Sequence, residues 1–96
     1  MTVNCSAANL SFSVLCGGAY NTNGGYMSMI PGGSRNLAKG DYSFAAGYRA
    51  KANHAGSFVW ADHQEHDFGS TVANGFFVRS VGGVKLVTGV DSSGHR

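Results

Sequence analysis

Charged residues are scarce in this chain, and proline is almost absent. Lys and Arg number 7 and Asp and Glu 5 among 96 residues, which leaves a formal net charge of +2. So weak a charge argues against nucleic-acid binding, which needs a dense basic surface. The ordinary hydrophobic share of 43% argues against a highly charged disordered chain. The single proline excludes collagen and polyproline linkers.

Long apolar runs are missing as well. No stretch approaches the roughly 18–20 apolar residues of a membrane-spanning helix, so we expect no direct membrane insertion. The N-terminus lacks the basic start and continuous apolar core of a secretion signal. Any export would be encoded elsewhere, and these residues leave the location of the chain open. No segment has capped 3.6-residue periodicity, so we expect almost no helix.

Glycine is abundant, at 15 of 96 residues, and helps to mark an internal repeat. Each unit is a serine followed by three apolar residues and then a glycine, or an alanine in the last copy. The spacing of the units is 15, 15 and 14 residues, as marked by their serines Ser13, Ser28, Ser43 and Ser57. A period this short matches one β-coil of two short strands and two tight turns, whose neighbours must stack to bury an apolar face.

Three consecutive apolar residues indicate a strand that is covered on both faces. The middle residues of the triplets, such as Ile30, would face one side, and the first and third residues would face the other. One side is the roll interior, and a symmetric copy of the chain is the simplest cover for the other. We therefore expect a homo-oligomer, whose core and interface include Leu15, Ile30, Phe44, Phe58 and Trp60.

The repeat pattern ends near residue 62, which divides the chain into β-roll repeats at 1–62 and a second region at 63–96. In the second region, residues 75–81 and 84–90 have the composition of strands. Gly82-Gly83 between them is typical of a two-residue hairpin turn. The expected fold is all-β: a parallel β-roll or β-solenoid of 15-residue coils, followed by a loop and a C-terminal β-hairpin.

The two cysteines, Cys5 and Cys16, are 11 positions apart. Cys16 occupies the third position of an apolar triplet, where a free thiol packs like a small apolar side chain. The sequence therefore favours a buried free thiol over a disulfide, and it leaves the redox compartment open.

The third unit resembles a known family. Asn36-Leu37-Ala38-Lys39-Gly40, followed by Asp41-Tyr42-Ser43-Phe44-Ala45-Ala46-Gly47, is similar to the head repeats of trimeric autotransporter adhesins and of phage tail-fibre-like proteins. The resemblance covers about residues 11–90. It implies a left-handed parallel β-roll, a homotrimer and a structural or adhesive role at a cell surface, in the extracellular space or on a virion. It carries over no catalytic residue and no cofactor.

Two further hypotheses concern chemistry. A carbohydrate- or ligand-binding module on the same scaffold would use exposed rings and cations in the outer turns to bind a surface glycan or other extracellular ligand. Its candidate residues are Tyr20, Arg35, Tyr48 and Arg49.

A metal-dependent enzyme would use the cluster from His63 to Asp67, with His63 and His66 as weak candidate ligands. Zinc sites need three or four fixed ligands, and a zincin motif needs two histidines four apart on a helix. The cluster lacks that motif, so a polar loop without metal is favoured. The repeating serines are interpreted as structural and not as nucleophiles, so we expect no enzyme and no cofactor.

Overall fold

The computed structural model describes residues 5–7, 12–90 and 92, and these residues form strands, turns and loops without any helix. No membrane-spanning helix is therefore present among them. In chain order the strands are β1 (Cys5–Ala7), β2 (Val14–Cys16), β3 (Thr22–Asn23), β4 (Met29–Ile30), β5 (Gly33–Ser34), β6 (Leu37–Ala38), β7 (Phe44–Tyr48), β8 (Ala50–Ala52), β9 (Phe58–Ala61), β10 (Phe68–Gly69) and β11 (Phe76–Arg79).

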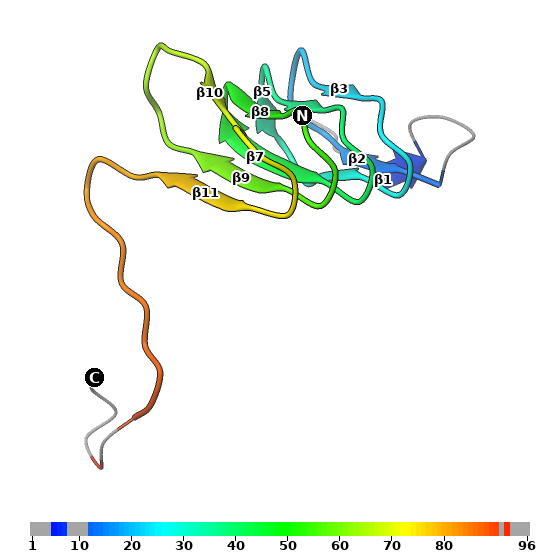
Figure 1. The fold of residues 1–96 in the computed structure, drawn as a ribbon. Coiled ribbons are helices and arrows are strands. Elements are labelled where there is room, and N and C mark those ends of the chain that lie inside the picture. Colours follow the sequence, from blue (N-terminus) through cyan, green and yellow to red (C-terminus); the bar gives the residue numbers. More distant parts are fainter. Residues whose placement is uncertain (1–4, 8–11, 91, 93–96) are drawn as a thin grey trace.

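The strands form two sheets that face each other as the walls of a narrow coil (Figure 1). The larger sheet has the order β1-β2-β4-β7-β9-β11, with β5 pairing the far end of β7, and the smaller has the order β10-β8-β6-β3. From β2 onward every pair in the larger sheet is parallel, as are all pairs in the smaller sheet. The chain is a parallel β-solenoid of about four turns with the predicted spacing.

The interior is filled by the middle residues of the apolar triplets. Ile30, Ala45 and Val59 are all 0% exposed, and Leu15 is partly buried against them. The smaller sheet contributes three alanines that are equally buried, Ala38, Ala50 and Ala52. Because side chains alternate along a strand, an inward middle residue turns its two neighbours outward. The predicted division of each triplet into an inner and an outer side is confirmed.

Polar side chains at the turns bond to the backbone of their own and neighbouring coils. Asn36 is 1% exposed. Its Nδ2 donates to the carbonyls of Gly32 and Gly47 at 3.1 and 2.9 Å, and its Oδ1 accepts the N–H of Ala50 at 2.9 Å. Asn21 makes the equivalent bonds one coil earlier. Ser28 and Ser57 donate to carbonyls three residues earlier, at 2.8 and 2.7 Å, as expected of structural serines.

The predicted C-terminal hairpin is wrong. Residues 84–90 form no strand, and β11 pairs in parallel with β9, from Phe76 opposite Phe58 to Arg79 opposite Ala61. The segment is a fifth copy of the triplet that carries the larger sheet past residue 62. The repeat pattern does not reveal this copy for two reasons. Phe76 follows Phe58 by 18 positions, and the residue before Phe76 is a glycine where the other units have a serine.

The free-thiol prediction for Cys16 is also wrong, since Cys16 is disulfide-bonded. The reason lies in β1, which pairs antiparallel with β2 at the first edge of the larger sheet. This register places the backbone of Cys5, the one other cysteine of the sequence, directly opposite Cys16.

Close contact between coils predicts a sharp effect of one methyl group. A Cβ added at Gly47, whose φ is +100°, would lie 1.9 Å from the carbonyl oxygen of Ala61. We expect Gly47→Ala to lower the free energy of unfolding by at least about 2 kcal/mol, measured by chemical denaturation at fixed protein concentration. Gly24→Ala is the control, because a Cβ there meets nothing within 4 Å. Equal effects of the two substitutions would contradict close coil packing.

Candidate functional site

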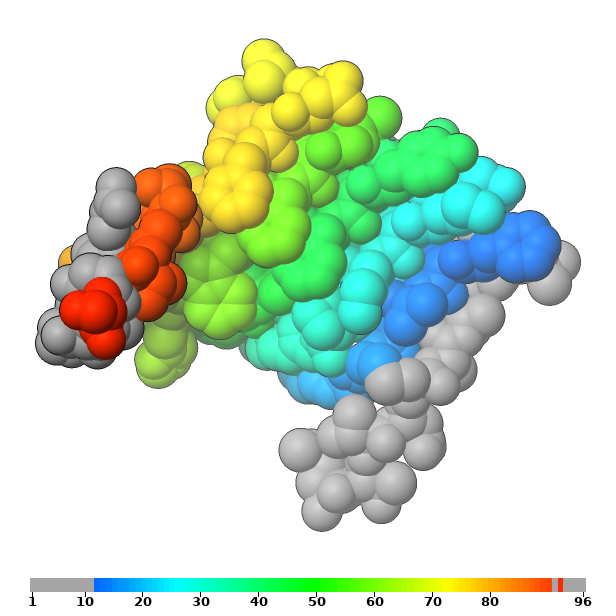
Figure 2. Space-filling view, turned by 90° about the horizontal axis from the view of Figure 1, so that it is seen from below, coloured from blue at the N-terminus to red at the C-terminus, as the bar shows by residue number. Residues whose placement is uncertain are grey.

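The outer face of the larger sheet carries a continuous apolar column. The first residues of the five triplets lie in register: Val14, Met29, Phe44, Phe58 and Phe76. The last three rings are stacked nearly parallel, with centroid separations of 4.4 and 4.7 Å. Figure 2 looks at the molecule from below Figure 1, and successive coils lie there side by side as bands from blue to yellow.

This face is uncovered in the single chain. Met29 is 39%, Trp60 42% and Phe76 66% exposed, while Phe44 and Phe58 are half-buried by their stacking. Trp60 is exposed in the single chain, so its expected place in a core or interface stays a prediction that needs another copy of the chain. The physical reason is the strand alternation, since Val59 points inward and Trp60 must point outward.

A second aromatic row continues at the turns that precede the outer column. Phe12, Tyr26 and Tyr42 contact one another edge to face, at centroid separations of 6.3 and 5.9 Å. Phe12 and Tyr42 have φ values of 58° and 56° and are 70% and 63% exposed. Bulky residues seldom adopt this left-handed conformation. In the coil between them the equivalent residue is Met27, which has a φ of 50°.

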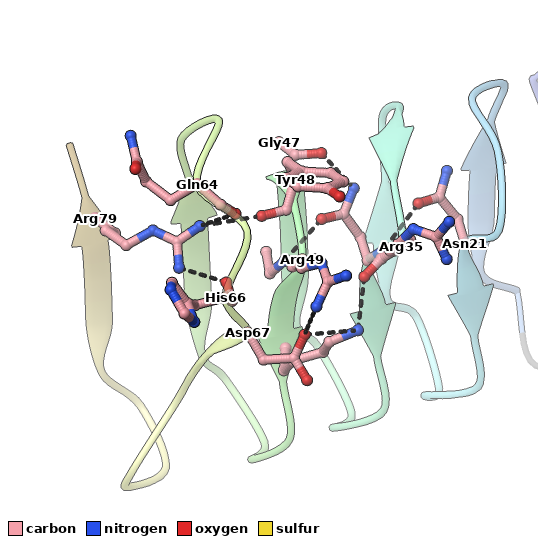
Figure 3. A network of polar contacts seen from close by, with 12 residues as sticks. Asn21, Arg35, Gly47, Tyr48, Arg49, Gln64, His66, Asp67 and Arg79 are labelled. Carbon is pink, nitrogen blue, oxygen red and sulfur yellow. Dashed lines mark hydrogen bonds and ion pairs between the residues drawn. The ribbon is translucent and has the colours of Figure 1, made fainter. Parts of the chain in front are cut away.

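The four candidate ligand-binding residues gather at another corner of the coil, and Figure 3 shows three of them, Arg35, Tyr48 and Arg49. The guanidinium of Arg35 lies over the ring of Tyr20 at 4.8 Å, and that of Arg49 lies over the ring of Tyr48 at 5.4 Å. Tyr20, Arg35 and Arg49 occupy the same position of successive coils, with φ values of 58°, 58° and 65°. The structure brings all four to one edge, and their binding of a ligand stays a prediction.

Two further residues belong to this corner. Lys51 Nζ donates to the carbonyl of Arg35 at 2.6 Å. The carboxylate of Asp67 lies 3.6 Å from Arg49 and 3.9 Å from Lys51, and it is 63% exposed. Sequence reasoning missed both contacts, although Lys51 follows Arg35 by 16 residues and so falls one coil later. The Tyr48 side chain raises the pKa of Arg49, so this corner keeps its cation at every pH of interest.

The polar cluster from His63 to Asp67 is organised by Arg79, which the sequence had not singled out. Arg79 Nε donates to Asp62 Oδ1 at 2.9 Å. Its two Nη groups donate to the carbonyls of Asp62, Gln64, His66 and Tyr48 at 2.5–3.4 Å. The side chains of Arg79 and Asp62 are only 18% and 19% exposed. One guanidinium therefore closes the loop, as Figure 3 shows.

The two histidines of this loop contact Tyr48 and Arg79. The ring of His63 contacts the ring of Tyr48 at 5.6 Å, and His66 offers its carbonyl to Arg79. Among the described residues, no three His, Cys, Asp or Glu side chains are grouped to hold a metal ion. The same part of the chain forms no pocket. The site features that the structure does present are thus an apolar face and a cationic, aromatic corner, both on open surface.

Comparison of the chain with protein-family models, curated proteins and solved structures finds no match. The structure itself identifies the chain as a parallel β-solenoid of about four turns.

The ion pair that closes the loop predicts a defined pH dependence. The N–H of Val81, 2.7 Å from Asp62 Oδ2, lowers the pKa of Asp62; partial burial opposes this, and Arg79 adds to it. A carboxyl with a lowered pKa stabilises the fold above its unfolded pKa of about 3.9, and this contribution is lost as the pH falls through the lower, folded-state pKa. We expect Asp62→Asn to be less stable than wild type at pH 7, with a gap that narrows below about pH 4.

Thermal melts between pH 7 and pH 2 measure this gap. Asp67→Asn is the matched control, since that carboxylate is mostly exposed and its ion pairs are long. It should cost less at pH 7 than Asp62→Asn. A gap for Asp62→Asn that stays constant with pH would show that the charge of Asp62 contributes nothing.

Proposed function

We propose that the chain is a non-catalytic structural and adhesive module of the adhesin-head type, which works as a homotrimer at a cell surface, in the extracellular space or on a virion. The observation that carries the proposal is the outer apolar column of the larger sheet. Its rings are in register over successive coils, and Phe76 at its end is exposed. Trp60 lies beside the column on the same face of the sheet and is exposed as well. Monomeric proteins rarely expose such a contiguous apolar surface unless it has a binding role.

A second copy of the chain is the cover that fits this column. A face built from one residue of every coil is straight, so it matches the same face, or the neighbouring side, of an identical roll. Small domains also bury a modest share of their surface on folding. The interior of this roll gains little from its alanines, so burial of phenylalanine and tryptophan between copies would contribute a large part of the stability.

The choice of a trimer and of an adhesive role rests on the resemblance of residues 36–47 to adhesin-head and tail-fibre-like repeats. A cyclic, side-by-side arrangement closes without leaving an outer column bare. It also leaves the turns at the corner of Arg35 and Arg49 on the outside of the assembly. Those turns are the part of the module that an adhesive contact would use.

The native mass in solution tests the association. We expect sedimentation equilibrium at micromolar concentration to give three times the chain mass, and Trp60→Ser to weaken the assembly at least about tenfold. Tyr20→Ser is the control, because Tyr20 is 77% exposed and contacts Arg35 in the outer turns and not the apolar face of the larger sheet. A wild-type monomer at this concentration would refute the proposal. If the Trp60→Ser variant forms a trimer as stable as that of the wild type, the outer apolar face around Trp60 is not part of the interface.

A second candidate function is favoured by the corner of Tyr20, Arg35, Tyr48 and Arg49. Two cation–ring pairs stand one coil apart there, with Lys51 beside them. Rings with polar edges stack on sugars, and guanidinium groups pair with carboxylate or sulfate. The corner therefore fits an acidic carbohydrate more closely than a neutral one.

Binding to an array of acidic and neutral glycans tests this candidate. We expect retention of acidic glycans that Arg49→Gln weakens at least about tenfold and that rising salt reduces. Lys39→Gln is the control, since it removes one positive charge in the turn before Gly40, away from the Tyr20–Arg49 corner. An array without hits, or equal losses in both variants, would exclude the corner as a specific site.

A further inference from the structure

The two ends of the larger sheet are finished differently. At one end β1 lies antiparallel on β2 and covers its edge. At the other end β11 pairs with β9 alone, and no other strand of the described residues lies beyond it. An open edge in a solenoid exposes backbone groups and the end of its core, which such proteins normally cap.

The free groups of this edge follow from the bonds on its paired side. The N–H of Phe58 donates to the carbonyl of Gly75 at 2.9 Å, and that of Asp62 donates to the carbonyl of Arg79 at 3.1 Å. Backbone groups alternate in direction along a strand, so those of Phe76 and Val78 face away from β9. The half-buried ring of Phe77, which packs on the core, lies at the same end.

The segment that follows β11 has the character of a strand without a partner. Residues 84–90 leave the roll and run away from it, as Figure 1 shows. Apolar and β-branched residues dominate the segment, and Val84, Leu86 and Val90 are 59%, 80% and 69% exposed. These three alternate positions would share one face of a strand.

The chain turns directly after β11, and residues 84–90 form no strand beside it. Gly83 N–H donates to the carbonyl of Ser80 at 2.9 Å, which closes a turn directly after the strand. The N–H of Val81 is held by Asp62 Oδ2 at 2.7 Å, and Asp62 is itself held by Arg79. The open edge and the unpaired strand are thus both present in one chain but are kept apart.

We propose that residues 84–90 of one copy add as a strand to the open edge of β11 in a neighbouring copy. The proposal rests on the side-by-side association described above, which sets the open ends of the copies at one level. Seven extended residues span about 23 Å, which is long enough to pair along the whole of the four-residue strand β11. The added strand supplies partners for Phe76 and Val78, and its apolar face covers Phe77 at the end of the roll.

Amide exchange and isotope-filtered spectra of the native assembly test the exchange of strands. We expect the amides of residues 84–90 to exchange at least about tenfold more slowly in wild type than in Leu86→Pro, which removes a donor from the middle of the strand. Ser92→Pro, beyond the segment, is the control and should leave the exchange unchanged. In mixed labelled and unlabelled protein, contacts of Leu86 with Phe77 should join different copies.

Each outcome separates this proposal from the proposed function. A trimer whose 84–90 amides are unprotected, or whose Leu86 contacts lie within one chain, overturns the strand exchange and leaves the trimer standing. A monomer in sedimentation overturns the proposed association, and the strand exchange with it. Leu86→Pro should retain the native mass that Trp60→Ser loses, because the outer column is untouched.

Discussion

Parallel backbone hydrogen bonding between successive coils, at an offset of one coil, is the constraint on which the whole structure depends. It places each residue directly over its equivalent, so every choice of side chain becomes a column. At Gly47 the column leaves no room for a Cβ, because the next coil approaches within 1.9 Å of that position. At Asn36 the same closeness lets the side-chain amide bond to Gly32 of its own coil and to Gly47 and Ala50 of the next coil. At these two positions the turns are therefore closely packed against the neighbouring coil.

This arrangement separates the columns that hold one chain together from those that face outward. The inner column alternates Ile30, Ala45 and Val59 and is fully buried. The outer column places the larger side chains, phenylalanine and tryptophan, on the exposed side. In an ordinary small domain the large apolar residues fill the core. Here the distribution is reversed, which is the physical reason for proposing that the true core of the particle lies between chains.

Much of the fold was predictable from the sequence because equivalent residues of successive coils recur at a nearly fixed interval. The 15-residue period and the division of each triplet into two sides follow from residue spacing and strand alternation, and the burial of Ile30 and Val59 then shows which side is the interior. The fifth coil was missed because the loop closed by Arg79 lengthens the spacing to 18. The disulfide of Cys16 was missed because β1 runs antiparallel and lies outside the repeat. The candidate residues of the cationic corner were assigned to outer turns from their residue types, but the contacts of Lys51 and Asp67 depend on how those turns fold.

The ion pair of Asp62 and Arg79 explains how the roll tolerates the longer loop. An insertion in a solenoid normally threatens the register of every later coil. Here Arg79, the last residue of β11, binds the carbonyls at the start, middle and end of the loop. The loop is thereby folded back on its own coil, and β11 still pairs with β9 in the common register. Asp62 meanwhile holds Val81 and fixes where the chain leaves the roll. The side chains of Asp62 and Arg79 thus lie where the regular repeat ends. They also set the direction of residues 84–90, so they join the stacked coils to that segment.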